Sequence, residues 1–298
     1  MTSAWEATAA PANGTPDPGW AGRTGPRRSA IGTALPRSPT FLVGAAILLF
    51  WIVDAACWRL LVPYDPQRIF PTTLRAPSGQ HLLGTDNLGR DVLSRLLSGA
   101  STVLTIAPAA TALGMVGGVA LGLATGYWRG LLDDVAMRIV DAVLAFPLVI
   151  IAVLVLTTLG SSEFDVIVLI GVTFTPLVAR TVRSAVLAER NLEYVASARL
   201  AGESAPRIMI SEILPNIVGP IVVEGTIRLG YAIFTSATLS FLTLGIQQPS
   251  PDWGLTISLG QIYLQVAPWM VLFPALALAT LVVAVNLVAD GLSQAVRA

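Results

Sequence analysis

Six apolar stretches dominate the chain, and polar or mixed segments separate them. The stretches run from about Phe41 to Val62, Thr102 to Tyr127, Ala136 to Leu159, Val166 to Leu187, Ile217 to Leu242 and Pro268 to Val288. Each is close to or above the ~20 residues that a helix needs to cross the hydrocarbon core of a bilayer. A transmembrane barrel would instead show ~10-residue segments of alternating polarity. The pattern therefore predicts an all-α membrane protein with six transmembrane helices.

The same pattern divides the chain into three parts. Residues 1–38 are rich in Ala, Pro, Gly, Ser and Thr, and such a segment buries too little apolar surface to fold. We expect a disordered cytoplasmic tail there. Residues 39–98 hold the first transmembrane helix and an external loop. Residues 99–298 form a five-helix core that contains a polar cytoplasmic segment, 193–215.

Arginine counts predict the orientation. With six crossings both termini share one side, and that side holds twelve arginines against five on the other, while Arg228 lies inside the fifth stretch. Basic residues concentrate on the cytoplasmic side of membrane proteins. We therefore expect a multi-pass protein of a bacterial inner membrane with both termini in the cytoplasm.

Composition excludes several classes of function. Only 12% of residues are charged, 54% are hydrophobic, and the formal net charge is zero, which gives no case for nucleic-acid binding. The single cysteine, Cys57, and the single histidine, His81, exclude disulfides and Cys/His metal clusters. The chain has no lysine and so no G-x-x-x-x-G-K-[ST] nucleotide loop. We predict no catalytic residue, no metal site and no cofactor in this chain.

Glycine and proline positions predict features of the bundle. Gly114, Gly118 and Gly122 are spaced four apart, which lets two helix backbones approach closely. Packing within the bundle is favoured over a homodimer contact. Pro147 and Pro176 fall inside the third and fourth stretches, and we expect kinks in both helices.

The segment between the fourth and fifth stretches predicts two short helices joined by a turn. Small residues at 196–198 would give the first helix a narrow face, and Gly202 could end it with a positive φ. Leu214-Pro215 would begin the next helix. A narrow helix suits docking into a groove of a soluble partner, with Glu193 and Arg199 at the rim. An ordinary solvated loop is the alternative.

This segment resembles the EAA loop of ABC importer permeases. The match falls on Ser197, Ala198, Gly202, Ile213, Leu214 and Pro215. The sequence departs from the motif at Ala196, which occupies the position of the motif glutamate. Glu193, one helical turn earlier, is the candidate substitute. The resemblance implies that ATPase subunits dock on this loop.

A second motif lies in the first external loop, between His81 and Arg95. It is similar to the H-x-L-G-T-D-x-x-G-R-D-x-x-S-R signature of the dipeptide/oligopeptide/nickel permease family, in its C-type branch. The residues that carry it are Gly84, Thr85, Asp86, Gly89, Arg90, Asp91, Ser94 and Arg95.

The residue types in this motif predict a structural role. The glycines indicate turns, and Thr85 or Asp86 could cap the helix that follows. Asp86, Arg90, Asp91 and Arg95 could form an ion-pair network that braces the loop, and this is favoured over direct contact with substrate. A lone histidine without clustered partners is a poor candidate for a nickel ligand.

Charged residues also fall inside the apolar stretches, where charge is costly. Glu224 and Arg228 have the i, i+4 spacing of a helical ion pair. They could neutralise each other or line a path for a polar solute. Asp54, near the middle of the first stretch, could pair with a neighbouring subunit.

The two resemblances together imply a type I ABC importer (MetI-like) permease that is not an enzyme. Such a subunit forms half of the translocation pathway for peptides or a related small solute. Its implied partners are a second homologous permease, two ATPase subunits or domains that hold ATP and Mg, an extracytoplasmic solute-binding protein and the lipid bilayer. An ion-gradient-driven secondary transporter is the alternative, but the sequence shows neither clustered coupling acids nor a clear repeat.

Overall fold

A computed structural model describes residues 39–297, apart from the side chains of residues 159 and 295–297, and the predicted tail 1–38 lies outside it. Four of its helices are long and apolar enough to cross a membrane: α2 (Pro39–Leu61), α3 (Val92–Trp128), α6 (Glu163–Glu189) and α12 (Trp269–Arg297). Two bent pairs supply two more spans. The first is α4 (Leu131–Ala145) with α5 (Leu148–Leu159), and the second is the segment Ala205–Asn216 with α10 (Val218–Phe241). With each bent pair counted as one span, the described residues give the six spans predicted.

The third predicted span is not one kinked helix, and that expectation was wrong. α4 and α5 meet at 86°, with Phe146 and Pro147 between them. Pro147 has no backbone N–H to donate, and its ring disfavours helical backbone at the preceding residue. Phe146 accordingly has an extended conformation, with φ −87° and ψ 131°. By contrast, α6 continues through Pro176 without a break.

The second span is longer than its apolar run. α3 begins at Val92, ten residues before the predicted start at Thr102. Asp91 is its N-cap, and its carboxylate accepts a hydrogen bond from the backbone N–H of Ser94. Such a cap satisfies one of the free N–H groups of the first turn. The helix start therefore depends on a polar residue that the hydrophobic pattern does not reveal.

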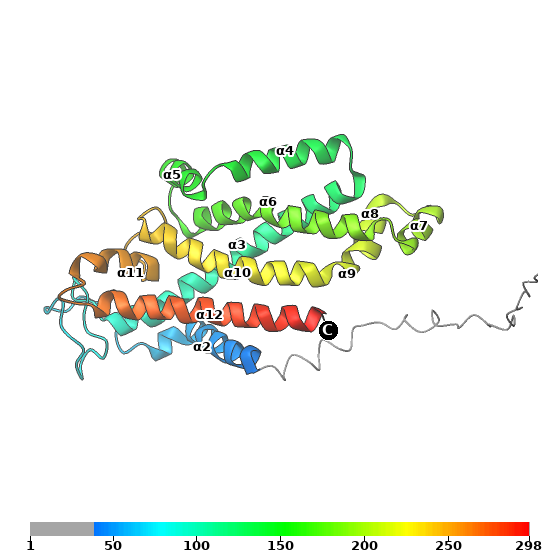
Figure 1. The fold of residues 1–298 in the computed structure, drawn as a ribbon. Coiled ribbons are helices and arrows are strands. Elements are labelled where there is room, and N and C mark those ends of the chain that lie inside the picture. The colour runs from blue at the N-terminus through cyan, green and yellow to red at the C-terminus, as the bar shows by residue number, and fades with distance from the viewer. Residues whose placement is uncertain (1–38, 298) are drawn as a thin grey trace, which may run out of the picture.

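The centre of the bundle is the close contact between α3 and α6, which lie side by side in Figure 1. A Cβ atom added at Gly118 would lie 2.4 Å from Cβ of Val178, and one at Gly122 would lie 2.7 Å from the carbonyl oxygen of Ala179. The small residues of α3 therefore let the two backbones approach. This confirms packing within the bundle as the role of the glycine spacing.

Tryptophans join the remaining helices at the core. Trp253, in the short helix α11 (Trp253–Gly260), is fully buried and donates through Nε1 to the carbonyl of Leu96 in α3 at 2.8 Å. Its ring lies 4.9 Å, centre to centre, from that of Trp51 in α2. Trp51 in turn donates to Oγ1 of Thr280 in α12 at 3.1 Å. The sequence analysis did not predict α11.

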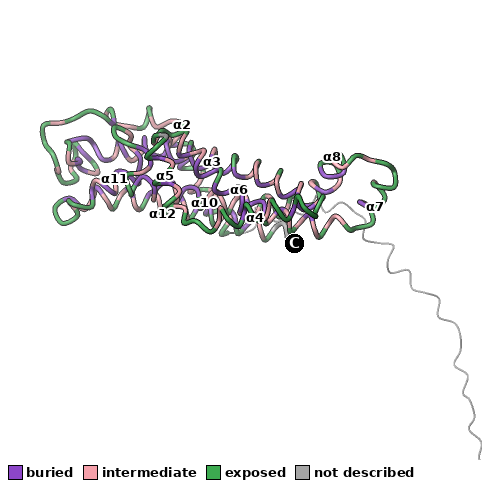
Figure 2. Tube along the Cα trace, turned by 90° about the horizontal axis from the view of Figure 1, so that it is seen from above, coloured by how far each residue is buried: buried purple, intermediate pink, exposed green. Residues whose placement is uncertain are grey.

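The bundle is elongated, and its two ends differ (Figures 1 and 2). One end carries α11, followed by η4 (Gln261–Tyr263), together with the helix-free segment 62–91; we call it the α11 end. The other carries α7 (Glu193–Leu200) and α8 (Ala205–Arg207); we call it the α7 end. The two signature segments of the sequence therefore lie at opposite ends of the molecule.

Candidate functional site

The segment at the α7 end has the predicted shape of a short helix, a turn and a second helix. α7 ends in a pair of hydrogen bonds that enclose Gly202: the N–H of Gly202 donates to the carbonyl of Arg199 at 3.0 Å, and the N–H of Glu203 donates to that of Ala198 at 3.1 Å. This is the Schellman arrangement, which requires a left-handed residue after the helix. Gly202 has φ +79°, as its position predicted.

One face of this segment is anchored in the bundle. Val195, Ile208 and Ile213 are buried in one apolar cluster with Val178 and Val182 of α6. Burial of such side chains contributes ~1.5–3 kcal/mol each. The loop is therefore a fixed part of the fold rather than a solvated connection.

The opposite face of α7 is exposed and narrow, and Figure 2 shows this end projecting from the bundle. Ala196, Ser197 and Arg199 are exposed, while Ala198 is half-buried. Leu200 is 90% exposed at the last position of the helix. A large apolar side chain that is exposed beside small residues suits a docking surface. The sequence analysis missed Leu200, because its type alone does not distinguish an exposed residue from a core one.

Polar contacts fix the orientation of α7. The hydroxyl of Tyr194 donates to Oε2 of Glu189 at 2.8 Å, at the end of α6. Burial and this hydrogen bond to a carboxylate raise the pKa of Tyr194 above its usual range. The guanidinium of Arg199 lies 5.1 Å from the ring centre of Tyr127 in α3. Arg190 donates to the carbonyl of Tyr127 at 2.8 Å, as a cation at the C-terminus of α3.

The second short helix contains a π-helical turn, η3 (Ile208–Ile213), followed by α9 (Leu214–Asn216). Its last i→i−5 hydrogen bond runs from the N–H of Leu214 to the carbonyl of Met209. The next residue, Pro215, has no backbone N–H to donate. α10 then begins at Val218 after a bend of 72°. As predicted, a helix begins at Leu214-Pro215, but it is the three-residue α9, and the long membrane helix α10 begins only at Val218.

At the α11 end, the signature residues form a buried polar network. Oδ2 of Asp86 lies 2.6 Å from Nε of Arg90 and 3.9 Å from Nε of Arg95. Oδ1 of Asp86 accepts from the backbone N–H groups of Leu88 and Arg90, each at 2.8 Å. The predicted network is present around Asp86. A buried carboxylate that accepts several hydrogen bonds holds its loop in one conformation.

Asp91 has a different role from the one expected. It does not pair with an arginine in the described structure; it caps α3, and its Oδ1 lies 2.8 Å from Nδ1 of His81. The prediction that Thr85 or Asp86 caps this helix was therefore wrong. Thr85 instead accepts a hydrogen bond from the N–H of Arg75, and its carbonyl accepts from Nε1 of Trp269. Gly84 and Gly89 have φ near +80°, as turns require.

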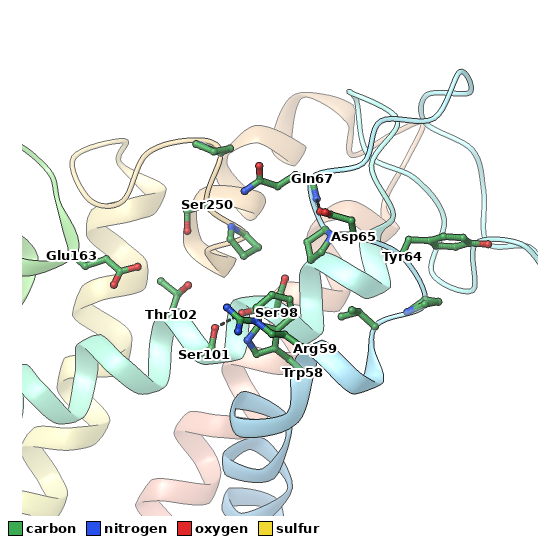
Figure 3. Close-up of a pocket in the computed structure, with 15 residues that line it drawn as sticks. Trp58, Arg59, Tyr64, Asp65, Gln67, Ser98, Ser101, Thr102, Glu163 and Ser250 are labelled. Atoms are coloured by element: carbon green, nitrogen blue, oxygen red, sulfur yellow. Dashed lines mark hydrogen bonds between the residues drawn. The ribbon is translucent and has the colours of Figure 1, made fainter.

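Arg95 extends this network to the wall of a cavity. Its guanidinium donates to the carbonyl of Ser250 at 2.7 Å and reaches those of Pro66 and Pro249 at 3.4 and 3.5 Å. These three residues line a cavity of about 900 Å³ at the α11 end. The charged residues that line this cavity are Arg59, Asp65 and Glu163, which are labelled in Figure 3. The signature thus holds segment 62–91 against Pro249 and Ser250.

Several charged residues inside the spans form ion pairs, whereas Asp54 does not. Oε1 of Glu224 lies 2.6 Å from Nε of Arg228, and Oε2 accepts from the hydroxyl of Thr181 in α6 at 3.2 Å. Asp141 in α4 pairs with Arg180 in α6. Asp54 is buried within this chain, and neither of its carboxylate oxygens has a hydrogen-bond partner among residues 39–297. It is therefore enclosed by its own bundle rather than turned toward a neighbouring subunit.

Comparison with known proteins identifies the family to which this chain belongs. The profile of a family described as "Binding-protein-dependent transport system inner membrane component" matches residues 118–298. The chain belongs to this family. It is therefore a multi-pass membrane subunit of a binding-protein-dependent ABC transporter, and not an enzyme. This supersedes the ion-gradient alternative.

Named relatives agree with the family over most of the permease. The chain is 38% identical over 256 residues to the glutathione transport system permease protein GsiD of Pectobacterium atrosepticum, with 85% of each chain covered. It is 36% identical over 261 residues to the di/tripeptide transport system permease protein DppC of Pseudomonas aeruginosa, over 85% of the permease and 86% of the relative.

A solved structure supports the fold. A chain of the MetNI methionine ABC transporter, in inward-facing conformations, matches with a TM-score of 0.57 at 21% identity. The match covers 68% of the permease and 96% of that chain. The MetI-like type I importer architecture expected from the sequence is therefore confirmed. Membership of the family implies that the permease works with ATPase and substrate-binding partners and carries no cofactor of its own.

Proposed function

We propose that this permease forms half of the translocation pathway of an ATP-driven importer for small peptides, together with a second, homologous permease. Two separate ATPase subunits or domains would hold ATP and Mg, and an extracytoplasmic binding protein would deliver the solute. The α7 end would face the cytoplasm, with both termini on that side. The names of relatives that transport glutathione or di- and tripeptides support the solute class.

The observation that carries the proposal is the exposed face of α7 on its buried base. Leu200 would enter a groove of the ATPase, and the small residues Ala196 and Ser197 would allow close approach. Glu193 is exposed in the first turn of α7, where it could take the place of the motif glutamate. The apolar cluster that joins Val195 and Ile208 to α6 would transmit a movement of α7 to the membrane helices.

The signature network at the α11 end would have a structural role in this account. Asp86 pairs with Arg90, and the terminal nitrogens of Arg95 donate to backbone carbonyls, which leaves little capacity to bind a solute. Asp91 and Ser94 are likewise engaged at the start of α3. They would hold the external loops in place for the binding protein.

The experiment is reconstitution of the complete transporter in liposomes, with binding protein outside and ATP inside. Uptake of labelled alanylalanine that requires both ATP and binding protein is expected. Uptake that continues without ATP but follows a proton or sodium gradient would contradict the proposal. A control with the nucleotide site of the ATPase inactivated separates transport from leakage.

A further inference from the structure

Two charged side chains lie half-exposed on the face of the bundle formed by α4 and α6. The side chains of Arg180 and Asp141 are 51% and 59% exposed, although they pair with each other. At 1.5 Å per residue, Arg180 lies about 6 Å from the midpoint of α6, well within the ~15 Å half-thickness of the hydrocarbon core. A charge at this depth normally faces the protein interior or water.

Other exposed positions in the spans show what a lipid-facing surface looks like here. Val116 in α3 is 71% exposed, Leu49 in α2 60% and Leu276 in α12 59%. These helices present apolar side chains. The face with Asp141 and Arg180 therefore differs in chemistry from surfaces that suit lipid contact.

A second pair lies on the neighbouring helix α10, and Thr181 of α6 contacts it. Thr181 follows Arg180 in sequence, and its hydroxyl donates to Glu224, which holds Arg228. The guanidinium of Arg228 lies 5.9 Å from the ring centre of Phe174 in α6. Phe174 also lines a small cavity of about 100 Å³ between α4, α5 and α6.

The charges lie on one side of this cavity. Leu144 of α4 and Leu177 of α6 line it, and Asp141 and Arg180 each lie three residues from these, toward the α7 end. Glu224 likewise lies one turn from Arg228 toward the α7 end. Three helices thus place two acids and two arginines in one band across the bundle, and we call Asp141, Arg180, Thr181, Glu224 and Arg228 the charged band.

We infer that the charged band lines the water-filled solute path, and that Asp141 and Arg180 are the residues that contact the charged ends of a zwitterionic peptide. This inference rests on the proposed importer function and deepens it. Arg180 exchanges the carboxylate of Asp141 for that of the peptide, while Asp141 binds the peptide ammonium. Each charge keeps an opposite partner throughout, so the exchange leaves no unpaired ion.

The two ion pairs differ in burial, and we assign them different roles on that basis. The side chains of Glu224 and Arg228 are only 9% and 16% exposed, and both have further contacts, with Thr181 and Phe174. They are a fixed pair that keeps the band polar. Asp141 and Arg180 are exposed and have no other ion-pair partner within residues 39–297, so they are free to exchange.

The test labels single cysteines in the assembled transporter in lipid nanodiscs, without binding protein. Cys57→Ser removes the native thiol, and Thr181→Cys places a thiol in the charged band without removing an ion pair. The matched control is Thr105→Cys in α3, which is exposed beside apolar residues of α2. We expect a charged, water-soluble methanethiosulfonate to modify the first variant and leave the second unmodified.

Alanylalanine should protect the thiol at position 181, and N-acetylated alanylalanine amide should not. Asp141→Asn or Arg180→Gln should raise the concentration for half-protection about tenfold, as expected for one lost charge-assisted contact. A thiol at 181 that is as unreactive as that at 105 would overturn the water-lined path. Labelling unaffected by alanylalanine, or equal protection by both peptides, would overturn the contact with peptide ends. Failure of ATPase and permease to assemble would instead refute the proposed function.

Discussion

The backbone N–H of Glu203 donates to the carbonyl of Ala198 at 3.1 Å, and this bond encloses Gly202 at φ +79°. Within residues 39–297, apart from Gly202 and its two neighbours in the chain, no heavy atom lies within 4 Å of the position that a Cβ would occupy at Gly202. The requirement for glycine is therefore one of backbone conformation and not of space. The turn holds the exposed tip of α7 in the direction that the proposed docking needs.

Substitutions at Gly202 should distinguish the effect of backbone conformation from the effect of side-chain size. Asparagine tolerates the left-handed region, whereas a β-branched residue is strained there by ~1–3 kcal/mol. We expect Gly202→Asn to retain ATP-dependent uptake and Gly202→Val to lose most of it. The measurement is initial uptake rate per assembled transporter. Equal loss in both variants would show that the left-handed turn is not what matters.

The contact between α3 and α6 should make Gly118 intolerant of even one methyl group. A Cβ there would meet Cβ of Val178 at 2.4 Å, so Gly118→Ala should destabilise the permease by ~1–3 kcal/mol. Gly225→Ala is the matched control in α10, where the nearest atom is the flexible tip of Met115 at 3.4 Å. Its melting temperature in detergent should be unchanged or higher, because alanine favours helix. A higher melting temperature for Gly118→Ala would contradict the packing.

Asp91 should be needed for the first turn of α3. It caps the helix and contacts His81, and loss of a buried cap with its partners costs ~1–2 kcal/mol or more. Asp91→Ala should lower the melting temperature clearly. Asp91→Asn keeps an acceptor for the N–H of Ser94 and should lower it less. Identical melting of the two variants would show that the cap contributes little.

Asp252 should make the stability of the α11 end depend on pH. Burial raises its pKa from 3.8 to about 6, although its carboxylate accepts from the N–H of Leu255 at 2.9 Å. Because the folded pKa is the higher one, ionisation disfavours the folded state, and stability falls as pH rises between about 4 and 6. Lowering the pH from 7 to 5 should therefore stabilise the permease by about 1 kcal/mol through this group.

Asp252→Asn isolates that contribution. The amide oxygen can still accept from Leu255 but does not titrate in this range. The melting temperature of the wild type should rise more than that of the variant between pH 7 and pH 5. A difference of the opposite sign would contradict the raised pKa.

The apolar runs were sufficient to predict four spans, because length and hydrophobicity decide whether a helix crosses a bilayer. α2, α6, α10 and α12 each begin within three residues of the predicted start. The break at Phe146–Pro147 and the early start of α3 at Val92 were not predicted. Both depend on local backbone chemistry, a proline ring and a capping carboxylate, that hydropathy does not record.

The candidate site was also predictable only in part, because only some of its features depend on local residue type. Gly202 and the network around Asp86 were found because their residue types restrict backbone or charge locally. The pair of Asp141 and Arg180 joins helices 39 positions apart in sequence, and the exposure of Leu200 depends on how α7 packs. Neither property is encoded in a short window of sequence.

The most direct test of the docking account is affinity purification of the whole transporter through a tag on this permease, followed by mass spectrometry. The wild type should bring both the ATPase and a second permease. Leu200→Asp, which places a charge at the exposed tip of α7, should lose the ATPase and keep the second permease, while Leu200→Met should keep both. Retention of the ATPase by Leu200→Asp at the wild-type level would contradict docking through α7.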